Sequence, residues 1–177
     1  MTATLRPLNI EPLTKWAFAA YGDVIETLGA ERRLINEGTT ERFHALARAD
    51  VTDESGSAIL SLFHVSRRPF PFHVRMLERH PLGSQAFYPL SGHDWLVVVG
   101  LGIDKPDPAA IRCFRATGHQ GVSYARNTWH HPVLILEAVQ DFLVLDRDGP
   151  GNNLEEHWFK PPAEQRVIDV AGMGSVP

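Results

Sequence analysis

An acid and a histidine stand two residues apart in the middle of the chain, just before a predicted turn. Glu78 and His80 are separated by Arg79, and a Pro-Leu-Gly stretch follows. In a β-strand, residues i and i+2 point to the same face, so the carboxylate and the imidazole should project side by side, with Arg79 on the opposite face. Gln85 begins the next apolar run. A carboxylate, an imidazole and a carboxamide that converge inside a barrel could transfer protons to and from a small polar substrate.

Short strands must position these residues. Apolar or alternating runs, separated by turn residues, predict strands over residues 58–65, 72–80, 85–90, 94–100, 111–116, 132–138 and 141–145. One helix is predicted near the start, between Leu13 and Ala20, with Thr14 as its N-cap and Gly22 after its end. Short strands without helices between them indicate a mostly β protein, an antiparallel sandwich or barrel.

The totals narrow the class of protein. A chain of 177 residues with 44% hydrophobic and 21% charged residues suits one soluble domain over residues 1–177. The net charge of -4 argues against nucleic-acid binding. Cys113 is the only cysteine, so an intrachain disulfide and a thiolate metal cluster are excluded. Residues 1–10 lack the apolar core of a signal peptide, and the run 95–103 is too short to cross a bilayer. We therefore expect a cytoplasmic protein with no membrane partner.

The spacing of the central segment resembles a degenerate first cupin motif. Glu78 stands at the first histidine position of that motif, His80 at the second, Gln85 at the glutamate position and Gly92 at the final glycine. Residues 118–124 resemble the second cupin motif, with Tyr124 at the position of the third histidine ligand.

A closer resemblance covers most of the chain, from about residue 5 to residue 147. The chain resembles the ureidoglycolate lyase family, cupin-like enzymes of allantoin breakdown that are also called ureidoglycolate hydrolases. The segments that carry the resemblance are Ala20–Thr27, Glu41–His44, Leu77–Phe87, Leu101–Asp107, Gly121–Pro132 and Asp141–Arg147. The resemblance implies a cupin-like double-stranded β-helix (jelly-roll) barrel with an N-terminal helix. It also implies a homodimer and cleavage of (S)-ureidoglycolate to glyoxylate and urea.

That reaction requires a base for the hydroxyl proton of the carbinol carbon and an acid for the departing nitrogen. Glu78 and His80 are the predicted pair, with the roles of acid and base left open. Gln85 offers an acceptor and a donor that suit the urea end. Tyr124 could hydrogen-bond the substrate. Of the adjacent His130 and His131, which point to opposite faces of an extended chain, we favour His130 for the pocket.

The substrate carboxylate needs a cation, best a guanidinium that binds it with two hydrogen bonds. Arg42 is the first choice because it lies in a segment shared with the family. Arg75 and Arg126 are alternatives, and Arg79 should face away from Glu78 and His80.

The sequence leaves open whether the site binds a metal ion. The motif positions cannot supply the usual cupin ligands, but Glu78 and His80, with His130 or a water, could hold a weakly bound Ni²⁺ or Mn²⁺ ion. The family is associated with divalent metal, and no organic cofactor is expected. The alternatives are an amidohydrolase that releases ammonia from ureidoglycolate, a metal-dependent cupin isomerase or oxygenase, and a non-catalytic cupin that binds a small carboxylate. The role of the chain after Gly149 is not predicted.

Overall fold

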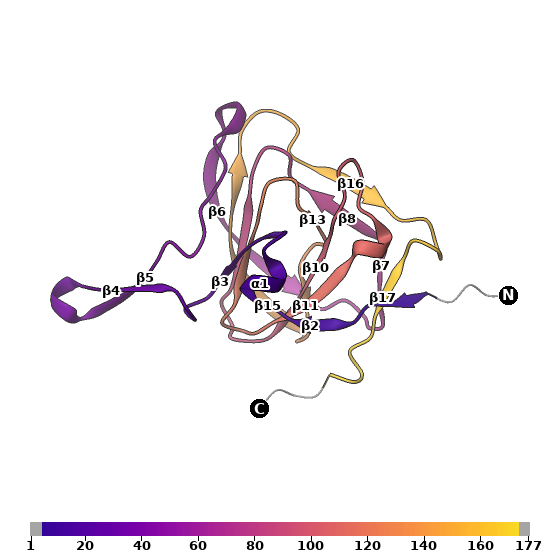
Figure 1. Ribbon diagram of the computed structural model, residues 1–177, viewed down its shortest axis with the longest axis horizontal. Helices are drawn as coiled ribbons and strands as arrows, with labels where there is room; N and C mark the ends of the chain where they lie inside the picture. Colours follow the sequence, from indigo (N-terminus) through magenta and orange to yellow (C-terminus); the bar gives the residue numbers. More distant parts are fainter. Residues whose placement is uncertain (1–4, 174–177) are drawn as a thin grey trace.

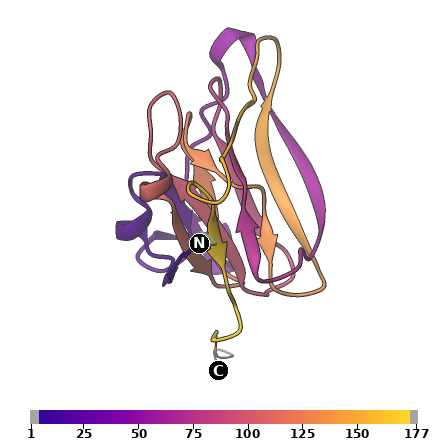
Figure 2. The ribbon, with the colours of Figure 1, turned by 90° about the vertical axis from the view of Figure 1, so that its right-hand side faces the viewer.

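The computed structural model describes residues 5–173 as a mostly β structure in which two large sheets face each other (Figures 1 and 2). The first sheet has five strands in the order β3-β12-β9-β15-β6. Its strands span Gly22–Ile25 (β3), Gly121–Tyr124 (β12), Gln85–Pro89 (β9), Val139–Asp148 (β15) and Ser57–Ser66 (β6). All of its ladders are antiparallel, and β6 and β15 pair over their full ten-residue length.

The second sheet has seven strands in the order β16-β8-β13-β10-β11-β2, with β14 also paired to β10. The strands span Glu155–Trp158 (β16), Met76–Arg79 (β8), Trp129–His130 (β13), Trp95–Gly100 (β10), Arg112–Ala116 (β11), Ile10–Pro12 (β2) and Leu134–Ile135 (β14). The order brings β8, which carries Glu78, next to β13, which carries His130.

Smaller elements complete the description. A three-stranded sheet joins β1 (Arg6–Pro7), β17 (Arg166–Ile168) and β7 (Phe72–Val74), and a two-stranded hairpin joins β4 (Glu31–Ile35) to β5 (Thr40–His44). The hairpin projects from the body of the molecule in Figure 1. The helical segments are α1 (Lys15–Phe18), η1 (Asn36–Gly38), η2 (Asp53–Ser55) and η3 (Pro108–Ala110).

The strand β10 lies at the centre of the molecule and is buried on both of its faces. Every residue of β10 is buried, with Trp95, Val97 and Val99 in one apolar cluster and Leu96 and Val98 in another. Side chains on successive positions of a strand point to opposite faces, so a strand buried on both faces must be apolar throughout. The first cluster fills the space between the two large sheets, since it includes side chains from β3, β9, β12 and β15 as well. The second cluster lies on the other face of β10 and is covered by the three-stranded sheet.

The resemblance implied a closed barrel, and this prediction is wrong. Within residues 5–173 the strands form open sheets, and no ladder joins β3 or β6 to the seven-stranded sheet. The helix is a single turn: Thr14 accepts a hydrogen bond from the backbone N–H of Ala17, as predicted for an N-cap, but the helix ends at Phe18. The strand predicted over 132–138 is reduced to β14.

Candidate functional site

Glu78 and His80 lie on the same face of the chain at the end of β8, as the two-residue spacing predicted. The preceding residue on that face is Met76, and Leu77 and Arg79 point to the other side. Arg79 forms an ion pair with Glu155 and lies 4.5 Å from the centre of the Trp129 ring. Arg79 is therefore engaged away from the cluster, as expected.

His130 joins this pair from the neighbouring strand. Its backbone is in register with Glu78, its ring centre lies 5.2 Å from that of His80, and its Nε2 lies 3.7 Å from Oε1 of Glu78. Its Nδ1 is 2.8 Å from the carbonyl oxygen of Thr128 and can only donate there, so Nε2 carries a lone pair. Burial, followed by the charge of His80, lowers the pKa of His130 to about 3, so the ring is neutral at pH 7.

Each ring nitrogen of His80 lies within hydrogen-bond distance of an oxygen atom. Nδ1 lies 2.7 Å from the carbonyl of Asn153, and Nε2 lies 3.2 Å from Oε1 of Gln85. The other end of the Gln85 amide donates to Oδ2 of Asp146 at 3.4 Å. Since a carboxylate only accepts, Asp146 favours the orientation of Gln85 that presents its oxygen to His80. The Asn153 carbonyl and the Gln85 amide oxygen can each accept a hydrogen bond from the His80 ring.

The carboxyl group of Glu78 is partly buried and electrostatically perturbed. Burial raises its pKa above the usual value, the positive charges of His80 and Arg68 oppose the rise, and the charge of Glu156 adds to it. A carboxylate of raised pKa is a stronger base than an exposed one.

Two adjoining cavities expose this cluster. One, of about 390 Å³, contains Glu78, Gln85 and Arg68 among its lining residues, and the other, of about 300 Å³, contains His80, Gln85 and Asn153. Gln85 lines both cavities, so the carboxyl of Glu78 and the ring of His80 are reached from neighbouring spaces.

Two predicted substrate-binding residues lie elsewhere. Arg42 is exposed on the β4–β5 hairpin, and Tyr124 is buried in the core between the sheets. Neither of them lines the two cavities, and His130, which the sequence favoured for the pocket, is buried and lines neither cavity. The ring of Tyr124 stacks on that of His130 with centres 4.1 Å apart and an interplanar angle of 13°. Tyr124 therefore packs against the His130 ring from within the core.

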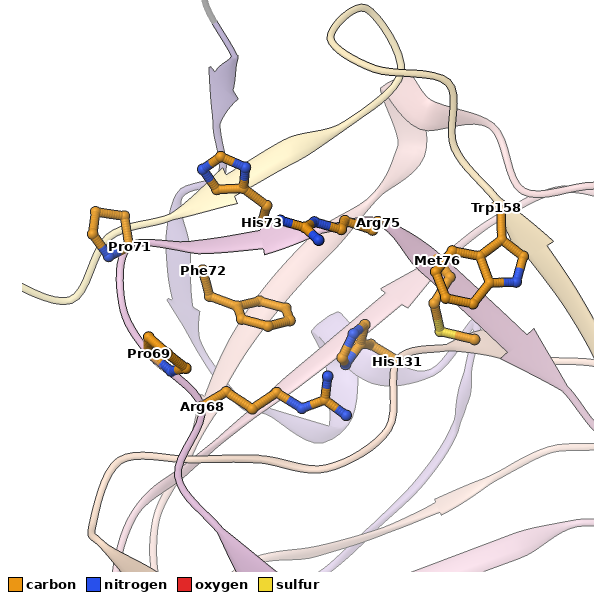
Figure 3. A pocket seen from close by; sticks show the side chains of 9 residues that line it. All are labelled: Arg68, Pro69, Pro71, Phe72, His73, Arg75, Met76, His131 and Trp158. Atoms are coloured by element: carbon orange, nitrogen blue, oxygen red, sulfur yellow. The ribbon is translucent and has the colours of Figure 1, made fainter.

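The alternative arginines differ in their surroundings. Arg126 is paired with both Asp50 and Asp53, whereas Arg75 and Arg68 line a third cavity of about 450 Å³ together with His131 (Figure 3). Arg68 lines this cavity and the Glu78 cavity. Nothing in the local sequence pattern marks Arg68 as a candidate for binding the substrate carboxylate.

The geometry of the Glu78–His80–His130 cluster fits a metal site. One ligand atom from each residue lies within 4.8 Å of the others, and Nε2 of His130 is buried without a hydrogen-bond partner. An unpartnered imidazole nitrogen beside a carboxylate suits a divalent transition metal. A metal bound by Nε2 of His80 would compete with its contact to Gln85.

Fold and site together define a class: a β protein of two facing sheets that carries a carboxylate–imidazole cluster suited to acid–base or metal chemistry. The family model described as ureidoglycolate lyase matches residues 5–166. This chain belongs to the ureidoglycolate lyase family.

Curated relatives support the same family. A ureidoglycolate lyase of Pseudomonas entomophila (strain L48) is 53% identical over 164 residues, which cover 93% of this chain and 97% of the relative. One of Pseudomonas putida (strain GB-1) is 54% identical over 164 residues with the same coverage. Among solved structures, oxalate decarboxylase of Bacillus subtilis is similar with a TM-score of 0.38 and 15% identity. That similarity covers 63% of this chain and 27% of the oxalate decarboxylase chain.

The match to residue 166 extends past residue 147, where the recognised motifs ended. Part of the site lies in this extension, because Asn153 contacts His80 and β16 pairs with β8. In the sequence the segment carries none of the motifs on which the resemblance rests. Only the tertiary pairing reveals its part in the site.

Proposed function

We propose that this protein cleaves ureidoglycolate to glyoxylate and urea by acid–base elimination at the Glu78–His80 pair. The observation that carries the proposal is the convergence of Glu78 and His80, each of which lines an accessible cavity, beside the buried His130, in a chain of the ureidoglycolate lyase family. Curated relatives that cover nearly the whole chain bear this enzyme name.

The surroundings of the two groups suggest their roles. The raised pKa of Glu78, caused mainly by burial, suits the base that takes the hydroxyl proton from the carbinol carbon. As that proton leaves, the C–O bond becomes a carbonyl and the C–N bond to urea breaks. His80, placed as a double donor by Asn153 and Gln85, suits the acid that protonates the departing nitrogen.

Gln85 and His130 complete the proposed site. Gln85 lies between the two cavities and can offer the urea group an acceptor and a donor. His130 is neutral and presents a lone pair toward Glu78. A divalent ion such as Ni²⁺ or Mn²⁺ would be held by Glu78 and His130, and by Nε2 of His80 only if that nitrogen released its contact with Gln85 and carried no proton; the ion would supply Lewis-acid chemistry.

Some expectations from the sequence remain proposals. They are a cupin-like jelly-roll arrangement of the two facing sheets, a single domain over residues 1–177, a cytoplasmic location and a homodimer. None of the helices described in residues 5–173 is long and apolar enough to cross a membrane.

The deciding experiment is to incubate the pure protein with ureidoglycolate and quantify urea, glyoxylate and ammonia in the same sample. We expect one urea per glyoxylate and no free ammonia. Ammonia released in step with glyoxylate, without urea, would instead identify an amidohydrolase. Binding of ureidoglycolate with no product at all would favour the non-catalytic carboxylate-binding protein.

A further inference from the structure

The residue Arg68 stands where the catalytic cluster meets a larger, basic cavity. It follows β6 and lines both the cavity of Glu78 and Gln85 and the cavity of about 450 Å³ that Figure 3 shows. In Figure 3 its side chain reaches toward His131. The cavity in that figure is also lined by Arg75 and His73, and no acidic side chain lines it.

The guanidinium of Arg68 has no anionic partner among residues 5–173. Arginines near the cluster are engaged differently: Arg79 is paired with Glu155, Arg126 with Asp50 and Asp53, and Arg147 donates to backbone carbonyls. An arginine that lines a cavity without an ion pair can bind an external carboxylate without first breaking an internal contact.

The surroundings of Arg68 orient it without neutralising it. Its guanidinium carbon lies 5.8 Å from the centre of the Phe72 ring, within the range of a cation–π contact. His131 is buried beside the same cavity, and its Nδ1 lies 2.7 Å from the carbonyl oxygen of Pro132.

Arg68 and Glu78 line the same cavity, so one small ligand can reach both side chains. Among residues 5–173 the two side chains form no ion pair with each other. In ureidoglycolate the carboxylate and the hydroxyl are attached to the same carbon. A carboxylate at Arg68 would place that hydroxyl on the side of Glu78.

We propose that Arg68 is the carboxylate-binding residue of this site, which holds a small 2-hydroxy or 2-oxo carboxylate at the junction of the two cavities. The assignment rests on the proposed lyase function for the identity of the substrate. It replaces Arg42, which lies on the exposed hairpin. Arg75 lines only the larger of the two cavities and adds positive charge there.

The first test compares the substrate with its carboxamide analogue in the wild type, Arg68→Ala, Arg68→Lys and Arg67→Ala. Arg67 is the matched control because it is adjacent, carries the same charge and lies over Phe70 without lining either cavity. A lost charge-assisted hydrogen bond should lower kcat/KM for the acid about ten- to a hundredfold in Arg68→Ala. The preference for acid over amide should disappear in that variant and persist in Arg67→Ala. Arg68→Lys should recover only part of the preference, because lysine lacks the planar fork.

The second test is independent of turnover and uses calorimetric titration with glycolate. Binding should be at least tenfold weaker in Arg68→Ala than in the wild type and unchanged in Arg67→Ala, with circular dichroism showing that both variants are folded. Wild-type glycolate binding in Arg68→Ala, or an equal loss in Arg67→Ala, would overturn the assignment. If the wild type released no urea but still lost glycolate binding with Arg68→Ala, the lyase function would fail and the carboxylate site would stand.

Discussion

The His80 ring is held on both sides, by the Asn153 carbonyl at Nδ1 and by the Gln85 amide oxygen at Nε2. Such contacts fix the orientation of the ring and the positions of its protons before the substrate arrives. The same ring lies against a neutral His130, whose lone pair faces Glu78. The site therefore combines a fixed proton donor, a partly buried carboxyl and an unoccupied lone pair within 4.8 Å.

Replacing His80 with Asn should remove the acid while keeping a polar side chain in its place. General acid–base catalysis typically contributes about a hundred- to ten-thousandfold, so kcat should fall by that order with an unchanged fold. The measurement is steady-state release of urea, with circular dichroism as the control for folding. A fully active His80→Asn variant would remove His80 from the mechanism.

Replacing Glu78 with Gln should abolish the base and also change how stability depends on pH. Burial raises the pKa of Glu78 in the folded state, so the native protein retains this proton to higher pH than the unfolded chain. The stability that Glu78 contributes is present below the unfolded pKa and is lost as pH rises through the raised folded pKa. Relative to the wild type, Glu78→Gln should therefore gain thermal stability between pH 4 and pH 8.

The readout for that prediction is Tm across the pH range, in buffer treated with a chelator. Glu155→Gln is a suitable control, since Glu155 pairs with Arg79 outside the cluster. An equal Tm difference between Glu78→Gln and the wild type at pH 4 and pH 8 would contradict the role of burial.

At the scale of elements, the segment from Asn152 to Trp158 lies against β8, the strand that carries Glu78. β16 pairs with β8 in register from Glu155 opposite Arg79 to Trp158 opposite Met76. Just before it, Asn153 accepts the backbone N–H of Leu82 at 2.8 Å with its side chain and contacts His80 with its carbonyl. The segment thus holds both the end of β8 and the turn that follows.

Replacing Asn153 with Ala should loosen this turn while leaving the backbone carbonyl in the chain. The lost side-chain hydrogen bond should cost about 1 kcal/mol of stability. It should also lower kcat, because the Asn153 carbonyl would hold the His80 ring less firmly in one orientation. Asn152→Ala is the control, since Asn152 lines the same cavity but its side chain accepts a hydrogen bond from the backbone N–H of Leu154, at 3.4 Å, and from neither β8 nor the turn after it among residues 5–173. Denaturant unfolding and urea release measure the two effects, and identical behaviour of the two variants would refute the positioning role.

At the scale of the whole molecule, the long β6–β15 pair leaves an apolar surface on the five-stranded sheet. The exposed fraction is 68% for Leu60, 71% for Leu62 and 39% for Leu143. Cross-strand pairing sets Leu62 opposite Leu143, and β6 is an edge strand with an unpaired side. A long apolar edge usually needs a covering partner, and a second copy of the same strand offers a self-complementary one. This surface is where we expect the proposed homodimer to form.

Sedimentation at micromolar concentration should then give about twice the chain mass of 19.7 kDa. Leu62→Lys should shift the protein to the monomer, because it places a charge at the centre of the apolar surface. Ile103→Lys is the matched control: Ile103 is 87% exposed but lies outside this sheet, in the loop after β10. A wild type that sediments only as a monomer would rule out the dimer.

The sequence alone determined the features that depend on local pattern. The i, i+2 spacing placed Glu78 and His80 on one face, the apolar runs predicted most strands, and Thr14 was recognised as an N-cap. Motif order led to the family, which the family model and the curated relatives confirm. These inferences succeeded because strand period, capping and motif spacing are properties of neighbouring residues.

Only the tertiary structure decided which distant residues meet that pair. Arg68 precedes Asp146 and Asn153 by more than seventy residues. The fold brings Arg68 to the cavity of Glu78 and the other two residues to the adjoining cavity of His80. Arg42 shares a family segment but folds into a projecting hairpin, so local sequence could not show its distance from the cluster. The barrel likewise depends on whether the edge strands β3 and β6 find partners, and such partners are set by the whole packing arrangement and not by any one segment.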